Sequence, residues 1–151
     1  MAETGTTHSF EKILSVRKRD KDQAQMDYQH SVTNFETKAT QLYHLLSKKE
    51  YMEEKYQNFL KNSSTITQLA SHSTYIEKIK LQIRQLEELV SRARSEMEGK
   101  QGKLTDAHVE VKKFEKLIER KKQLQEEKLM HQESVLMDEA SAIQFLKSRI
   151  R

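Results

Sequence analysis

The chain has 151 residues, of which 35% are hydrophobic, 7% aromatic and 33% charged. This composition provides too little apolar surface for a thick globular core, but enough for the narrow seam between two helices. Cysteine is absent, which excludes disulfides, a thiolate nucleophile and the usual sulfur-ligated zinc sites. The net charge of +4, from 27 basic and 23 acidic residues, is too small and too evenly mixed to indicate a nucleic-acid-binding protein.

Proline is absent and only three glycines occur, so the usual signals for strands and hairpin turns are missing. The sequence therefore predicts an all-α protein. Disorder is the alternative for so polar a chain, but mixed charges and periodic apolar residues are rare in disordered segments. Residues 1–12 lack the apolar core of a signal peptide, and no run of about 18 apolar residues occurs. We expect a cytoplasmic protein without membrane insertion.

The first predicted helical arm covers residues 9–61, where seam residues repeat every seven positions. One row contains Leu14, Lys21, Tyr28, Phe35, Leu42, Lys49 and Tyr56. The other contains Phe10, Arg17, Ala24, Ser31, Lys38, Leu45, Met52 and Phe59. Several members are polar, and drift toward a 3.6-residue period would let neighbouring apolar residues fill these gaps. Those neighbours are Val32, Ala39, Leu46 and Leu60.

A reversal of the chain is predicted at residues 62–68. Small polar residues from Asn62 to Thr65 compete with the helix through side-chain to backbone hydrogen bonds. We place the apex at residues 64–66. With an equal rise on both arms, Phe59 should face His72, and Leu14 should face Leu117.

The second predicted arm covers residues 69–150 and has the cleaner repeat. Its first row is unbroken over eight members, Leu69, Ile76, Ile83, Val90, Met97, Leu104, Val111 and Ile118. Its second row contains Ile79, Leu86, Ala93, Ala107 and Phe114, with polar members at His72, Lys100 and Lys121. A strict seven-residue repeat predicts a left-handed coiled coil. Gly99 and Gly102 are candidate positions at which this helix could bend.

Together the arms predict a single domain, an elongated antiparallel two-helix coiled coil, or helical hairpin, formed by a monomer. Lys121 to Arg151 would then project as a C-terminal helical overhang of about 45 Å. The overhang carries an apolar stripe that includes Leu129, Leu136, Met137, Ala140 and Ile143. We interpret this stripe as a docking surface, because a flexible tail needs no periodic apolar face. Packing on residues 1–10, or fraying, is the alternative.

Basic residues cluster in both arms near the joined ends of the predicted hairpin. Arg17, Lys18, Arg19 and Lys21 would lie beside the segment from Lys112 to Lys122 and form a basic collar. A solvated helix face with Glu110, Glu115 and Glu119 as ion-pair partners is the alternative for that segment.

Signals of catalysis are absent from the sequence. There is no glycine-rich phosphate loop, no nucleophile elbow and no histidine pair at metal-binding spacing. Paired carboxylates such as Glu53 and Glu54 have no concave site in which to act. We therefore expect no enzymatic activity, no cofactor and no metal.

Four short motifs, in order along the chain, resemble the flagellar type III export protein family FliJ. The first motif comprises Phe10, Ile13, Leu14, Arg17 and residues 22–24. The second is Tyr75 and Ile76 followed by Ile79 and Ile83, and the third is the segment 111–116. The fourth is the segment 137–140, Met-Asp-Glu-Ala. The resemblance extends from Phe10 to about Ala142.

This resemblance implies a stalk similar in shape to the rotor shaft of F-type ATP synthase. Its implied partners are the export ATPase FliI, the export gate protein FlhA and substrate chaperones, at the membrane-associated flagellar export apparatus. Carried over by position, the gate contact would involve Tyr75, Ile79, Gln82 and Leu86, of which Gln82 and Leu86 differ in type from the family pattern. As a hypothesis from charge, the ATPase ring would meet Arg17, Arg19, Lys112, Lys116 and Arg120.

Two other interpretations remain open from the sequence. A structural or scaffold coiled coil could dimerise in parallel through the seam from Leu69 to Ile118. The equivalent stalk of an injectisome would have the same shape and a different ATPase. For Ile79 and Leu86, packing in the coiled-coil core is an alternative to gate contact.

Overall fold

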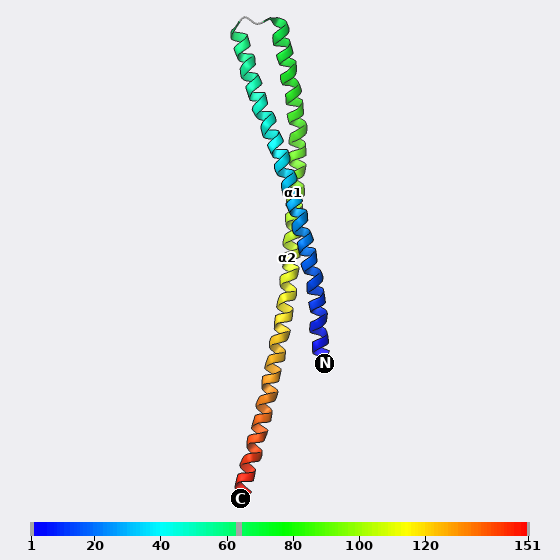
Figure 1. Ribbon diagram of the computed structural model, residues 1–151, viewed down its shortest axis with the longest axis vertical. Helices are drawn as coiled ribbons and strands as arrows, with labels where there is room; N and C mark the ends of the chain where they lie inside the picture. Colours follow the sequence, from blue (N-terminus) through cyan, green and yellow to red (C-terminus); the bar gives the residue numbers. More distant parts are fainter. Residues whose placement is uncertain (1, 63–64, 151) are drawn as a thin grey trace. The chain divides into compact units, whose positions relative to one another are not determined.

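The computed structural model describes residues 2–62 and 65–150, with the side chains of residue 5 and of residue 7 onward. Two helices account for nearly all of this range: α1, Ala2–Lys61, and α2, Ile66–Ile150 (Figure 1). No strand occurs in these ranges, which confirms the all-α prediction. Helix α1 begins before residue 9, and α2 begins at Ile66, within the segment predicted as the turn. Ser63 and Ser64, within the segment predicted as the turn, lie outside the described residues.

Polar side chains and backbone groups define the two helix ends beside the turn. The backbone N–H of Asn62 donates to the carbonyl of Asn58 over 3.0 Å, which closes the last turn of α1. At the start of α2, the hydroxyl of Thr65 accepts a hydrogen bond of 3.3 Å from the N–H of Gln68. Thr65 is therefore the N-cap of α2, because it satisfies one of the N–H groups that a helix start leaves without a partner.

Contacts divide the chain into two compact units. The turn unit comprises Asp22–Asp106, and the terminal unit comprises Met1–Lys21 together with Ala107–Arg151. Both helices contribute to each unit. The prediction that residues 1–151 form a single domain stays a prediction.

The core of the turn unit is supplied mainly by α2. Its buried apolar side chains are Ile76, Ile79, Ile83, Leu86, Val90 and Ala93. These residues alternate between the two seven-residue rows, as the side of a helix that faces a coiled-coil partner requires. Helix α1 contributes half-buried residues and one buried polar residue, Ser31, whose hydroxyl donates to the carbonyl of Tyr28 over 2.7 Å.

Contacts across the turn unit establish that its helices run antiparallel. The rings of Phe59 and His72 lie 4.7 Å apart between centroids, as the sequence predicts. Farther from the turn, Lys48 Nζ lies 5.3 Å from the centre of the Tyr75 ring. Farther still, the guanidinium of Arg94 lies 5.5 Å from the centre of the Phe35 ring. Residue numbers fall in α1 as they rise in α2, which confirms the helical hairpin.

The terminal unit has a smaller core, in which Val111 and Ile118 are buried. The rings of Phe10 and Phe114 lie 6.3 Å apart, and Arg17 Nε lies 4.0 Å from Glu110 Oε2. This order is again antiparallel. Leu14 and Leu117 are both half-buried, and the pairing expected for them stays a prediction.

The seam of α1 follows the strict seven-residue rows throughout residues 10–59. Every member of the two rows is half-buried or buried, including the polar members. Two of the residues expected to fill gaps, Leu46 and Leu60, are instead 42% and 52% exposed. That detail of the prediction is wrong because supercoiling keeps the rows on the seam, so α1 does not drift toward a 3.6-residue face.

The C-terminal segment of α2 lies beyond the seam. Lys121 Nζ lies 4.6 Å from the centre of the Phe10 ring, and Gln125 is the last half-buried residue of α2. All residues from 126 to 150 are exposed. The helical overhang is thus confirmed, but its uncovered part begins at residue 126 and not at Lys121.

Candidate interaction surfaces

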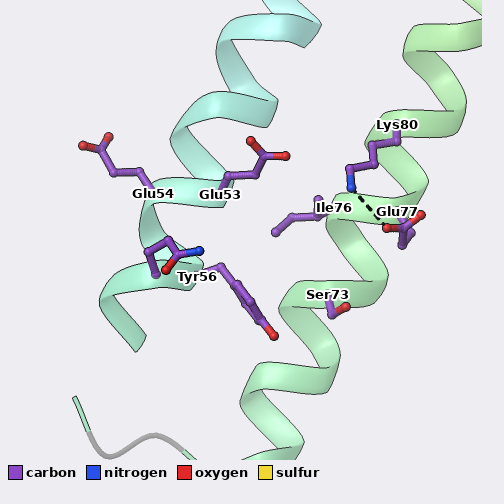
Figure 2. Close-up of a pocket in the computed structure, with 8 residues that line it drawn as sticks. Glu53, Glu54, Tyr56, Ser73, Ile76, Glu77 and Lys80 are labelled. Atoms are coloured by element: carbon purple, nitrogen blue, oxygen red, sulfur yellow. Dashed lines mark hydrogen bonds and ion pairs between the residues drawn. The ribbon is translucent and has the colours of Figure 1, made fainter. Parts of the chain in front are cut away.

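An open groove lies between α1 and α2 in the turn unit. It has a volume of about 430 Å³ and is lined by Glu53, Glu54, Tyr56 and Gln57 from α1 and by Ser73, Ile76, Glu77 and Lys80 from α2. Figure 2 shows Glu53 and Tyr56 directed toward α2, whereas Glu54 points away. Lys80 Nζ lies 3.3 Å from Glu77 Oε1, and Lys49 Nζ lies 3.8 Å from Glu53 Oε1.

The groove is an open surface on which three glutamates, Glu53, Glu54 and Glu77, outnumber one lysine, Lys80. Two of its three carboxylates, Glu53 and Glu77, form ion pairs with half-buried lysines. Because solvent reaches these pairs, they contribute little to the free energy of folding. It does not enclose a substrate in the way that general acid or base catalysis needs. In the described ranges, histidine, aspartate and glutamate also form no group of three that could hold a metal ion.

The four predicted gate-contact residues occupy different environments in the turn unit. Ile79 is 1% exposed and Leu86 is 9% exposed, so both belong to the seam. Tyr75 is half-buried beneath Lys48, and Gln82 is exposed. Of the four, Tyr75 and Gln82 are therefore the residues that a partner could reach without opening the helices.

The predicted ATPase-contact residues all belong to the terminal unit. Arg19, Lys112, Lys116 and Arg120 are exposed. Arg17 is half-buried at a seam position, with Nη1 3.5 Å from Asp20 and Nε 4.0 Å from Glu110. Lys112 pairs with Glu115 over 3.6 Å. The unit therefore brings the two basic clusters together, with acidic residues interleaved.

The residues of the C-terminal stripe share one property, exposure. Leu129, Leu136, Met137 and Ile143 are between 53% and 71% exposed, and Ala140 is also exposed. Within the part of the chain that the structure describes, neither helix has a stretch apolar and long enough to cross a membrane.

Comparison with known proteins decides the family. A family model described as Flagellar FliJ protein matches residues 7–149. The chain belongs to the FliJ family. A FliJ protein of Bacillus subtilis (strain 168), named Flagellar FliJ protein, is 35% identical over 111 residues, which is 74% of this chain and 76% of that protein. No solved structure matches.

The groove of this FliJ-family hairpin was not predicted from its sequence. Apart from Tyr56 and Ile76, its residues flank the seam rows, and polar flanking residues occur along the whole length of any coiled coil. The bulky seam residues Tyr56 and Phe59 are the one local signal, because large side chains keep neighbouring helices apart. The cation–π contacts of Lys48, Arg94 and Lys121 also required the structure, since they join residues far apart in sequence.

Proposed function

We propose that this protein is a non-enzymatic stalk of the flagellar type III export apparatus. In this proposal it binds the ring of the export ATPase FliI, contacts the export gate FlhA and assists the delivery of substrates by their chaperones. It regulates the ATPase and is held at the membrane-associated apparatus through the gate. Membership of the FliJ family and the two-helix hairpin support this role.

The observation that carries the ATPase contact is the basic collar of the terminal unit. Ten basic residues, Arg17, Lys18, Arg19, Lys21, Lys112, Lys113, Lys116, Arg120, Lys121 and Lys122, accompany four acidic ones, Asp20, Glu110, Glu115 and Glu119. The ion pair between Arg17 and Glu110 joins the two clusters. A surface with this excess of positive charge favours an acidic partner and speeds association with it.

The test reverses three exposed charges of the collar, Arg19→Glu, Lys116→Glu and Arg120→Glu. The variant should stimulate the hydrolysis rate of FliI with an apparent affinity about tenfold weaker at low salt, and the difference should shrink as salt screens the charges. The matched control reverses three exposed charges of the turn unit, Lys78→Glu, Arg84→Glu and Lys103→Glu. Equal stimulation by both variants at low salt would overturn the contact.

For the gate, the proposal rests on Tyr75 and Gln82. Tyr75→Ala combined with Gln82→Ala should weaken binding to FlhA, measured by calorimetry, by several-fold to about 100-fold, since one buried aromatic anchor often dominates an interface. The control is Leu81→Ala, a change of a half-exposed apolar residue one position from Gln82. Unchanged affinity with an intact hairpin would exclude this surface.

The hairpin does not support the alternative role as a scaffold that dimerises in parallel. The seam from Leu69 to Ile118 is the side of α2 that packs on α1, so it is not free to form a parallel dimer. The injectisome alternative predicts the same hairpin. The match to a flagellar family favours the flagellar apparatus over it.

A further inference from the structure

The exposed end of α2, residues 126–150, is a helix with an uncovered row of large apolar side chains. Figure 1 draws it in orange and red, beyond the blue start of α1. Leu129, Leu136, Ile143 and Ile150 stand seven residues apart and lie on one face, with Ala140 between them. All four large residues are at least 53% exposed. A row of this spacing is the mark of a helix that pairs with another helix.

Charge along this segment indicates which direction the partner helix takes. Residues 126–139 contain five acidic side chains, Glu126, Glu127, Glu133, Asp138 and Glu139, and one lysine. Residues 140–150 contain two basic side chains, Lys147 and Arg149, and no acidic one. Two copies in parallel would place like charges together along the whole segment, whereas two antiparallel copies could bring Glu133 of each copy beside Lys147 of the other.

In the terminal unit, the side of α2 that packs on α1 is uncovered from residue 126 onward, so a second helix could pack there. Helix α1 covers the seam of α2 antiparallel to it, up to the contact of Phe10 with Lys121 and the half-buried Gln125. The stripe begins only four residues later, at Leu129. A second antiparallel helix would therefore continue the same two-helix packing beyond the start of α1.

We propose that two copies of this protein pair through residues 126–150, antiparallel and symmetric, to form a dimer. Leu129 of one copy then lies near Ile150 of the other, and Leu136 lies near Ile143. The paired segment spans about 37 Å, at about 1.5 Å per residue. This replaces the expectation of a monomer at high concentration, and it does not depend on the export role.

Sedimentation velocity over a range of concentrations tests the dimer. Because the paired helix is short, we expect a reversible rise from monomer to twice the monomer mass, with a midpoint on the order of 10 µM. Leu136→Asp with Ile143→Asp should weaken association at least about 100-fold, because both charges would be buried in the pair. The hairpin should stay folded, since both residues are exposed in the single chain.

The matched control is Phe145→Asp, a change of an equally large apolar residue that is 61% exposed. Phe145 lies two positions from Ile143 and on the opposite face of the helix, so this variant should associate as the unaltered chain does. A monomer at every concentration would overturn the proposal. Equal loss of association in Phe145→Asp would overturn the assignment of the face.

A mixing experiment tests the antiparallel direction. One variant carries Lys147→Glu and Arg149→Glu, and the other carries Glu127→Lys and Glu133→Lys. Each alone should associate at least about tenfold more weakly than the unaltered chain, because antiparallel pairing then opposes like charges. Their equimolar mixture should recover dimer formation. Unchanged association of each variant alone would overturn antiparallel pairing, because parallel copies oppose like charges with or without the substitutions. Failure of the mixture to recover would overturn it as well.

Discussion

Ile79 shows how narrow the core of this protein is at the scale of single residues. It is 1% exposed, the most completely buried of the large side chains in the described ranges, whereas Leu81, two positions along, is 50% exposed. In a two-helix seam, a side chain either faces the partner helix or faces water. Burial therefore alternates sharply along α2.

This alternation gives the first stability prediction. Ile79→Ala should lower the free energy of unfolding by about 2–4 kcal/mol, because it removes buried methyl groups and leaves a cavity. Leu81→Ala should lower it by less than about 1 kcal/mol. Urea denaturation followed by circular dichroism measures both. Similar losses in the two variants would contradict the position of the seam.

The glycines of α2 give the second prediction. Gly99 and Gly102 lie inside a continuous helix, and a Cβ atom added at either one would meet no other atom within 4 Å. Alanine loses less backbone entropy than glycine on helix formation. Gly99→Ala and Gly102→Ala should therefore each raise the free energy of unfolding by about 0.5–1 kcal/mol. A loss of stability in the same urea titration would show that one of the glycines serves packing.

At the scale of elements, polar residues in the seam show what holds the helices in place. His72, Lys100 and Lys121 interrupt the apolar rows, yet all three are half-buried. Lys121 Nζ lies over the Phe10 ring, and the His72 ring packs at a tilt against the Phe59 ring. The seven-residue repeat determines which residues face the other helix, and the polar residues His72 and Lys121 at these positions pack against aromatic rings of that helix.

The start of α2 gives a prediction for the element. Thr65→Ala removes the capping hydroxyl that accepts from the N–H of Gln68, and should cost about 1 kcal/mol of unfolding free energy. Thr67→Ala, two residues into the helix and exposed, should change stability by less than about 0.5 kcal/mol. Thermal denaturation separates the two. A smaller effect at residue 65 than at residue 67 would exclude the cap.

At the scale of the whole molecule, the hairpin fold predicts two cross-links within one chain. The chain contains no cysteine, so each introduced pair acts alone. Phe59→Cys with His72→Cys should close a disulfide in the turn unit, and Leu14→Cys with Leu117→Cys should close one in the terminal unit. Non-reducing electrophoresis should show faster-migrating monomers. The control, Leu14→Cys with Leu124→Cys, uses an exposed partner residue off the seam and should not close efficiently.

Much of this fold could be predicted because its contacts repeat. The row from Leu69 to Ile118 specifies a helix and the side that it buries, and the polar residues from Asn62 to Thr65 specify a reversal. The pairing of Phe59 with His72 then follows from equal rise on the two arms. Leu46 and Leu60 are the failures, because apolar character alone does not show whether a helix follows a 3.5-residue or a 3.6-residue period.

The sequence by itself determined two helices, their buried rows and the place where the chain reverses, because these depend on local spacing. Only the tertiary structure decided that Ile79 and Leu86 are inaccessible, that Arg17 meets Glu110, and that the uncovered part of α2 begins at residue 126. The physical reason is that these properties depend on which residues of the other helix lie opposite, and on where that helix ends.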